Sequence, residues 1–275
     1  MNAPLNPEKP SRGTVDWATV ERTLVKIDHL SPTFLEMNVL IGGGACYFYR
    51  QLLIRFDDAA FPPFPPNPEH ERLWLSKDID VIGTPKDEIP AELGLLPDQD
   101  GNCFIDGILV DSPDVAYMFD ANMARSTALR AVSKTGGASF LVASPALLLR
   151  EKRALLNDLT KDRPQDVIHA ETLERSCKML LCRWLEKRPM DRQTAVSWRF
   201  LADEVKEYAS DLLDDPVLVR RLKSAAEGLK DDPHGKSAYH WVKHKVLGAA
   251  PFPAQPHEGE LQQNPENQKK RPGLG

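Results

Sequence analysis

The pattern of apolar residues changes at Pro145, and this change limits the folds open to the chain. Before it, short apolar runs bounded by Gly and Asp alternate with helical patterns, which indicates strands mixed with helices. After it, residues 146–250 show only helical periodicity. The sequence therefore predicts an α+β protein. A small mixed sheet with helices would occupy residues 13–145, and an all-helical domain would occupy residues 146–250.

Both ends of the chain lack the apolar residues that a core needs. Residues 1–12 are rich in Pro, Asn and charge, and residues 251–275 in Pro, Gln, Asn and Gly. We expect a disordered tail at each end. The first segment has no apolar stretch typical of a secretory signal, and no run of the chain is long enough to span a bilayer. Four cysteines without CxxC spacing indicate free thiols in a reducing compartment. We therefore expect a cytoplasmic protein without membrane contact.

The charge of the chain argues against a general nucleic-acid coat. The net charge is -5, but the first 145 residues are acidic and residues 146–250 are mildly basic. One predicted helix carries basic residues that could face an RNA. They are interleaved with glutamates, so a solvated helix face accounts for them better. These basic residues are Arg175, Lys178, Arg183, Lys187 and Arg188.

Four short apolar segments are the predicted strands of the sheet: 37–41, 73–83, 103–110 and 138–144. A Pro-rich segment, residues 56–72, separates the first two. It contains five prolines in seventeen residues, which excludes a helix or a central strand. We expect a long loop here, either a surface excursion or a lid.

Two aspartates interrupt one of these predicted strands. Asp78 and Asp80 are two residues apart, so on a strand their side chains share one face. Burying two like charges is costly unless a cation neutralises them. A hard divalent ion such as Mg²⁺ is the usual partner of carboxylate oxygens. A solvated pair at the edge of a sheet is the alternative interpretation.

A third acid, Asp106, lies in the middle of the predicted strand 103–110. On a strand beside Asp78 and Asp80, its carboxylate could face the same metal ions. It could equally be a turn residue before a glycine. Asp111 and Asp114 have the sequence context of a loop and are the alternatives for a third acid.

Three consecutive glycines, Gly42, Gly43 and Gly44, follow an apolar run and precede a predicted helix at 45–54. Backbone N–H groups at such a turn can face an anion. The turn is not a P-loop, because no Gly-Lys-Ser/Thr follows, and Tyr47 breaks the dinucleotide-binding fingerprint. A purely structural turn is the alternative.

The order of these parts resembles the nucleotidyltransferase superfamily of the DNA polymerase β type. That pattern, an apolar residue with two small residues followed later by Asp-x-Asp, matches Ile41-Gly42-Gly43 and then Asp78 and Asp80. The chain is more similar still to bacterial nucleotidyltransferases found as toxins of abortive-infection and toxin–antitoxin systems. They share a glycine turn like GGGA at 42–45 and a strand like SKDID at 76–80.

The same enzymes continue with a Ser-Pro helix that bears a lysine and then a basic-Asp segment. Lys152, Lys161 and Asp166 stand at matching positions. For Lys152, an exposed helix cation is the alternative. The resemblance covers about residues 35–170, and no motif covers residues 171–275. One departure is the 33-residue spacing between the last glycine and Asp78, which exceeds the family's and contains the Pro-rich segment.

The resemblance implies a metal-dependent nucleotidyltransferase that moves a nucleoside monophosphate from an NTP to an acceptor hydroxyl. The three glycines, Ser76, Lys77 and Lys152 would contact the nucleotide. Asp78, Asp80 and Asp106 would bind Mg²⁺ or Mn²⁺ and carry the catalysis. This prediction depends on convergence of the three acids. A position of Asp106 far from the other two, or an Asp78–Asp80 pair that faces open water away from the glycine turn, would mean abandoning phosphoryl transfer by these three acids.

The acceptor and the biological role stay open at this point. Candidate acceptors are an RNA such as tRNA, a protein side chain or a small molecule. A toxin would imply a cognate antitoxin protein, which is an argument from analogy. Two other functions compete with this one. The Asp-x-Asp pair could belong to a sugar-nucleotide glycosyltransferase, or the fold could be a binding or regulatory module without catalysis.

Overall fold

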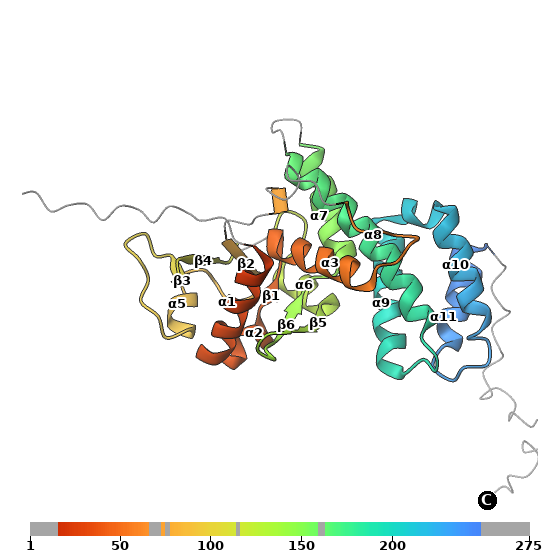
Figure 1. Ribbon diagram of the computed structural model, residues 1–275, viewed down its shortest axis with the longest axis horizontal. Coiled ribbons are helices and arrows are strands. Elements are labelled where there is room, and N and C mark those ends of the chain that lie inside the picture. The colour runs from red at the N-terminus through yellow and green to blue at the C-terminus, as the bar shows by residue number, and fades with distance from the viewer. Residues whose placement is uncertain (1–15, 66–72, 75–77, 114–115, 159–162, 249–275) are drawn as a thin grey trace, which may run out of the picture.

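The structure is a computed structural model, which describes residues 16–65, 73–74, 78–113, 116–158 and 163–248. The structure combines helices with a six-stranded mixed sheet, so the predicted α+β class is confirmed (Figure 1). Both predicted tails, 1–12 and 251–275, lie outside the described residues. Among the helices that the structure describes, none combines the length and the apolar character needed to cross a membrane.

The sheet has the strand order β3-β4-β2-β1-β6-β5. Its strands are β1 (Val39–Leu40), β2 (Asp78–Ile82), β3 (Cys103–Ile105), β4 (Ile108–Asp111), β5 (Leu129–Val132) and β6 (Ser139–Val142). The short central strand β1 pairs antiparallel with β2 and parallel with β6. Strand β2 pairs parallel with β4, while β3–β4 and β5–β6 are antiparallel pairs. The carboxyl end of β1 and the amino end of β2 therefore lie side by side at the same end of the two central strands.

Helices follow β1 and β6 directly, and several helices begin at a capping residue or a proline. The helices of this part are α1 (Trp17–Leu30), α2 (Pro32–Met37), α3 (Gly42–Phe56), α5 (Ile89–Glu92), α6 (Ala121–Thr127) and α7 (Pro145–Leu156). Helix α1 is capped by Asp16, whose side chain accepts a hydrogen bond from the Thr19 N–H. Helix α7 has Ser144 as its cap and Pro145 at its first position, the combination that favours a helix start.

After β6 the described residues contain only helices. These are α8 (Pro164–Glu186), α9 (Arg192–Tyr208), α10 (Pro216–Glu227) and α11 (Lys236–Trp241), with short 3-10 and π turns between and after them. Figure 1 shows them grouped at one end of the molecule, opposite the strands. The buried apolar residues nevertheless form one cluster that extends from Val20 in α1 to Val242 after α11. The helical part therefore shares its core with the sheet.

The described part of the Pro-rich segment packs against the helical part. Three arginine side chains of α8 and α10 each lie over an aromatic ring of residues 56–64: Arg183 over Phe56 at 4.5 Å, Arg221 over Phe61 at 5.6 Å and Arg175 over Phe64 at 4.0 Å. Such cation–π contacts are each worth about 0.5–1 kcal/mol at exposed sites. In its described part, this segment is an excursion held against α8 and α10.

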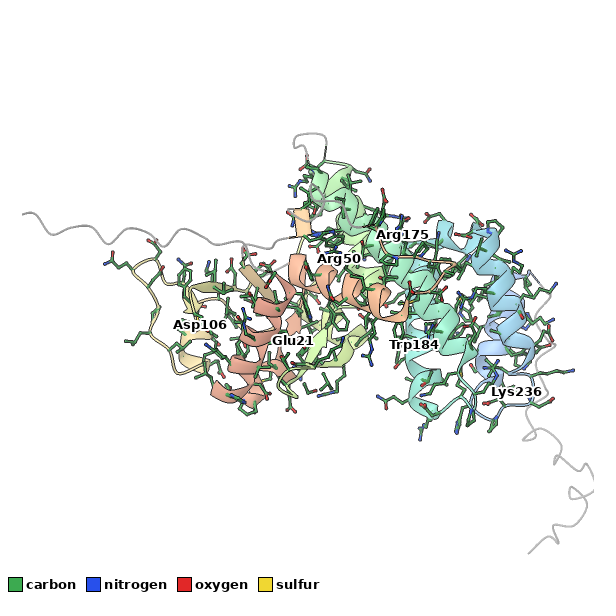
Figure 2. The ribbon with its side chains drawn as sticks, in the orientation of Figure 1. Glu21, Arg50, Asp106, Arg175, Trp184 and Lys236 are labelled. Carbon is green, nitrogen blue, oxygen red and sulfur yellow. The ribbon has the colours of Figure 1, made fainter. Side chains whose placement is uncertain are left out.

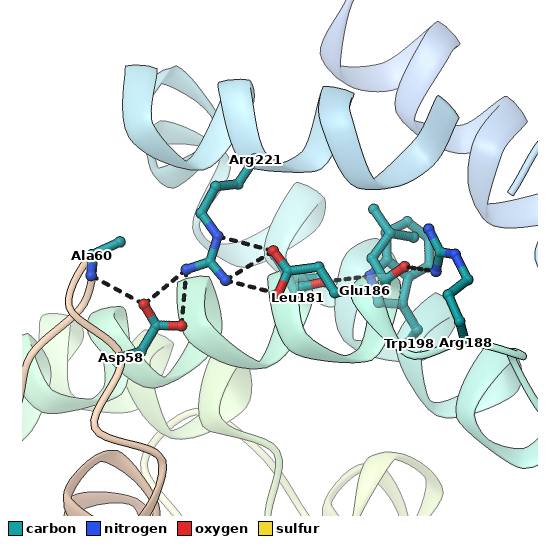
Figure 3. Close-up of polar contacts among 8 residues, drawn as sticks. Asp58, Ala60, Leu181, Glu186, Arg188, Trp198 and Arg221 are labelled. Atoms are coloured by element: carbon teal, nitrogen blue, oxygen red, sulfur yellow. Dashed lines mark hydrogen bonds and ion pairs between the residues drawn. The ribbon is translucent and has the colours of Figure 1, made fainter. Parts of the chain in front are cut away.

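A partly buried ion-pair cluster joins the same segment to two helices (Figure 3). The Arg221 guanidinium donates to both carboxylate oxygens of Asp58 at 2.8 Å, and its other nitrogens donate to Glu186 of α8. The Ala60 N–H also donates to Asp58, at 3.0 Å. Bidentate geometry makes such contacts stronger and more specific than single ion pairs. We call Asp58, Arg221 and Glu186 the arginine clamp.

The basic residues of α8 and the turn after it are engaged within the protein. Arg175 donates to the Pro62 carbonyl oxygen at 3.1 Å, and Lys178 pairs with Asp215 at 2.6 Å. Arg188 donates to the carbonyl oxygen of Ala225. These residues connect separate segments of the chain, a role that neither of the two sequence interpretations included.

One predicted strand is wrong. The segment 103–110 is a hairpin of β3 and β4, and its turn consists of Asp106 and Gly107, both with positive φ (52° and 78°). Asp-Gly is a favoured pair for such tight turns, because both residues tolerate the left-handed region. Strand β5 was not among the predicted strands.

Candidate active site

The glycine turn and the Asp-x-Asp strand meet at one edge of the sheet. Leu40 pairs with Val81, and the Ile41 N–H donates to the Asp80 carbonyl oxygen at 2.9 Å. Gly42 then turns the chain into α3 with φ +62°, and a Cβ placed on it would lie 2.0 Å from Oδ2 of Asp80. Gly42 thus lets the backbone approach a carboxylate more closely than any other residue allows.

The other two glycines lie in the first turn of α3. A Cβ on Gly44 would meet only the Leu40 side chain, at 3.4 Å, which is an ordinary packing distance. Position 42 therefore requires glycine, whereas position 44 could hold a larger residue. Ser76, Lys77 and Lys161, which the resemblance assigns to this region, lie outside the described residues.

Three aspartates lie on one face of the sheet beside this turn. Asp80 of β2 pairs in register with Asp111 of β4, and Asp78 lies two residues before Asp80 on the same face. Burial, with repulsion from Asp78 and then Asp111, raises the pKa of Asp80 to about 7. We call Asp78, Asp80 and Asp111 the acidic face.

Asp106 does not join the acidic face. It sits in the hairpin turn, 61% of its side chain is exposed, and it forms an ion pair with Lys26 of α1. Leu109 is the residue opposite Asp78, and Asp106 precedes Leu109 by three residues, in the turn before β4 begins. Figure 2 shows Asp106 in the region of β3 and β4, well separated in this view from Arg50 on α3. The prediction that places Asp106 among the converging acids is therefore corrected.

Asp111 occupies the place that was expected for Asp106. It was one of the two alternatives for a third acid, and the other, Asp114, lies outside the described residues. The parallel pairing of β2 and β4 brings Asp111 opposite Asp80. Its carboxylate lies 3.0 Å from Nζ of Lys86, a partly exposed pair that compensates only part of the negative charge.

A buried ion pair lies beside the acidic face. Lys152 of α7 donates from Nζ to Oδ1 of Asp166 at 2.8 Å, and Arg163 approaches the other oxygen at 3.3 Å. Lys152 is only 8% exposed, so the alternative of an exposed helix cation does not hold. Burial opposes its charge, yet the Cys46 thiol and Asp166 raise the pKa of Lys152 overall. Lys152 also acts on Asp80, whose pKa it lowers, so this cation lies close to the acidic face.

An aromatic and polar group lies between α3 and α8 near this ion pair. The Trp74 ring lies 5.1 Å from the His169 ring, and the Arg50 guanidinium lies 5.0 Å from the same indole. Burial lowers the pKa of His169 to about 3, so the imidazole is neutral. Neither of its ring nitrogens has a hydrogen-bond partner in the described part of the chain. No local pattern predicts this group, because its members are far apart in the chain.

The donor atoms of the acidic face match a hard divalent cation in kind. Carboxylate oxygens are the ligands of Mg²⁺, and a cation would relieve the repulsion that raises the pKa of Asp80. In the described residues, no three His, Cys, Asp or Glu side chains are close enough to hold an ion by themselves. Mg²⁺ usually completes its shell with substrate phosphates and waters, so a partial protein site fits this ion.

Comparisons with known proteins add no family to this geometry: no protein-family model, no curated protein and no solved structure matches the chain.

Proposed function

We propose that this protein is a metal-dependent nucleotidyltransferase, which moves a nucleoside monophosphate from an NTP to a hydroxyl of an acceptor. The observation that carries the proposal is the contact of Gly42 with Asp80 at the acidic face. Backbone N–H groups at the start of a helix, directly beside carboxylates that share one face of a sheet, suit a metal–triphosphate complex.

The acidic face would hold the metal, with Asp111 in place of Asp106. Mg²⁺ or Mn²⁺ bound there would neutralise charge on the triphosphate and stabilise the attacking and leaving oxygens. The N–H groups at the start of α3 face the phosphates, since the first N–H groups of a helix have no partner within it. Lys152 is the nearby point charge for the same phosphates, with Asp166 fixing its position.

The chemistry at the protein is then the movement of one proton. The acceptor hydroxyl binds beside Asp111, whose carboxylate takes its proton as the oxygen attacks the α-phosphorus. A bond forms between that oxygen and the α-phosphorus, the bond to the bridging oxygen breaks, and pyrophosphate leaves. Buried residues around Cys46 and His169 keep water away from this centre.

The rest of the chain has a role in this proposal too. Residues 13–145 form the nucleotidyltransferase core, and residues 146–250 form a helical domain that supplies the acceptor surface. Ser76 and Lys77, just before the acidic strand, add nucleotide contacts. The acceptor is an RNA such as tRNA, a protein or a small molecule in the cytoplasm. A toxin role would add a cognate antitoxin as partner.

Label transfer tests the proposal. The protein is incubated with Mg²⁺, each NTP labelled at its α-phosphate and a cell extract, and the labelled material is separated into RNA, protein and small molecules. We expect label in one fraction from the α-labelled NTP and none from the same NTP labelled at the γ-phosphate. An Asp80→Asn variant should transfer none. Absence of label with every NTP, or transfer from nucleotide-sugars instead, contradicts the proposal.

A further inference from the structure

A cavity lies between the sheet and α9, and its lining includes no residue of the acidic face. Its volume is about 180 Å³, room for several waters, so it exceeds what a single ion or water fills. The wall contains four hydroxyl side chains and five apolar ones. The hydroxyls belong to Ser126, Thr127, Ser144 and Ser197, and the apolar side chains to Ala128, Leu129, Val196, Phe200 and Leu201.

Glu204 of α9 completes this wall with a buried carboxylate. The residue is 8% exposed, and its Oε2 accepts a hydrogen bond from the Ser144 hydroxyl. Its Oε1 is buried and has no hydrogen-bond partner among the described residues. The Thr127 hydroxyl, also in the wall, interacts with the Glu204 carboxyl group and lowers its pKa, but burial outweighs this contact and the one from Ser144. A buried carboxylate oxygen with such weak support costs free energy, so this position favours a ligand that brings a stronger donor.

The charge around Glu204 is also unbalanced. Within the described part of the chain, it forms no ion pair with a lysine, arginine or histidine. Among the residues that the structure describes, Glu207 is the one other charged side chain that acts on it, a second carboxylate one turn further along α9. A carboxylate in this environment is complementary to a cation that brings its own N–H donors.

The mouth of the cavity is apolar and accessible. Val196 and Phe200 lie one turn apart on α9 and are 47% and 53% exposed, although both are large apolar residues. An apolar rim around a buried carboxylate and hydroxyl oxygens matches a ligand with an alkyl chain and a positively charged end. An inorganic cation would gain nothing from an apolar rim, because it has no apolar surface to bury.

We propose that this cavity binds an alkylammonium group. The ammonium donates to Oε1 of Glu204 and to hydroxyl oxygens of the wall, and the alkyl chain lies against Val196 and Phe200. The group has two possible sources with the same chemistry, a free aliphatic amine and the lysine side chain of a protein. The site does not involve the acidic face and does not depend on the nucleotidyltransferase proposal.

Ligand-observed NMR on the full chain, at fixed ionic strength, tests this. The probes are n-butylammonium chloride and, as its neutral counterpart, n-butanol. We expect the ammonium to bind with a dissociation constant on the order of 1 mM and the alcohol to bind at least tenfold more weakly. Glu204→Gln should weaken ammonium binding at least tenfold, while Glu36→Gln, an exposed carboxylate on α2, should leave it unchanged.

A second variant and a second arm complete the test. Ser197→Leu fills the cavity but keeps the carboxylate, so it should also abolish binding, even if Glu204→Gln fails to fold. A lysine capped at both backbone ends, compared with its Nε-acetylated form, separates the two sources. Tighter binding of the capped lysine supports a protein lysine, and tighter binding of n-butylammonium supports a free amine. Binding of neither, displacement by KCl alone, or binding that both variants retain would overturn the proposal.

Discussion

The arginine clamp and the acidic face differ in whether the charge of a buried carboxylate is compensated. In the clamp, burial raises the pKa of Asp58, but hydrogen bonds from Arg221 outweigh it and the pKa ends below its ordinary value. At the acidic face, burial and the neighbouring carboxylates act in the same direction, and the pKa of Asp80 rises to about 7. Each carboxylate of the clamp meets a guanidinium, whereas Asp80 faces two further acids.

This difference is what we expect between a structural role and the functional role that we propose. Compensated charges connect the Pro-rich segment to α8 and α10 and require no ligand (Figure 3). For Asp80, the nearby Lys152 lowers the pKa without offsetting burial and the neighbouring acids, so a bound cation would be stabilising there. Perturbed pKa values of this kind gather at functional sites. The variants below test the contrast, in order of decreasing effect.

Asp80→Asn should have the largest effect on activity and almost none on folding. Label transfer should fall on the order of 10³-fold, because a neutral amide cannot hold the metal that stabilises the reacting oxygens. Unfolding by urea should show equal or greater stability, since the variant removes a buried like charge. A loss of stability with full activity would reverse the assignment of the two roles.

Asp111→Asn and Asp106→Asn form a matched pair of substitutions. The first should reduce label transfer about 100-fold, because it removes a carboxylate opposite Asp80. The second changes an exposed turn residue paired with Lys26, so transfer should stay within about threefold of the original. Single-turnover rates with saturating NTP measure both. The opposite ranking would restore Asp106 as the third acid.

Arg221→Met should destabilise the protein by about 3 kcal/mol without loss of transfer activity. It leaves the Asp58 carboxylate buried without its guanidinium and breaks the contact to Glu186. Chemical denaturation gives the free energy of unfolding. Lys206→Met, a lysine that is exposed on α9, is the control and should change it by less than about 0.5 kcal/mol. Equal free energies of unfolding for the two variants would mean that the arginine clamp does not stabilise the fold.

Gly42→Ala should cost about 2 kcal/mol and abolish NTP binding, because its Cβ meets Asp80 and its φ is positive. Gly44→Ala adds the same methyl group two residues later, where it meets only Leu40 at an ordinary packing distance, and should stay within about 0.5 kcal/mol. Thermal unfolding with and without Mg²⁺ and NTP compares the two. Equal melting temperatures and equal NTP effects for both variants would mean that Gly42 is not in close contact with Asp80.

The pH dependence of stability should show the smallest effect. The pKa of Asp80 is raised by folding, so its stabilising contribution is present at low pH and is lost as the pH rises through about 7. Without metal, the protein should lose about 1 kcal/mol relative to Asp80→Asn between pH 6 and pH 8. The pKa of Glu204, also raised to about 7 by burial, is common to both proteins and cancels. Parallel pH profiles would show that Asp80 titrates normally.

The sequence was sufficient for the class of the fold and for the meeting of Gly42 with Asp80. That meeting needed only an antiparallel neighbour for β1, since β1 ends where β2 begins. The 33 intervening residues did not prevent it, because long insertions cost little entropy when they leave the core. In the described part, this insertion lies against α8 and α10.

The third acid could not be chosen from the sequence alone. Apolar residues on both sides of Asp106 are compatible with one strand or with two strands of a hairpin, and the strand was the wrong choice. The Asp106-Gly107 pair was the available signal for a turn. Asp111 depends on the register between β2 and β4, which no local pattern encodes. The burial of Lys152 depends likewise on Asp166 of the next helix.

Calorimetric titration of NTP in the presence of Mg²⁺ tests the central claim most directly. We expect one NTP site that requires the metal, is lost in Asp80→Asn and Asp111→Asn, and is retained in Asp106→Asn. Absence of metal-dependent NTP binding to the unaltered protein, or binding that survives loss of both Asp80 and Asp111, would contradict the claim that the acidic face holds a metal–triphosphate complex.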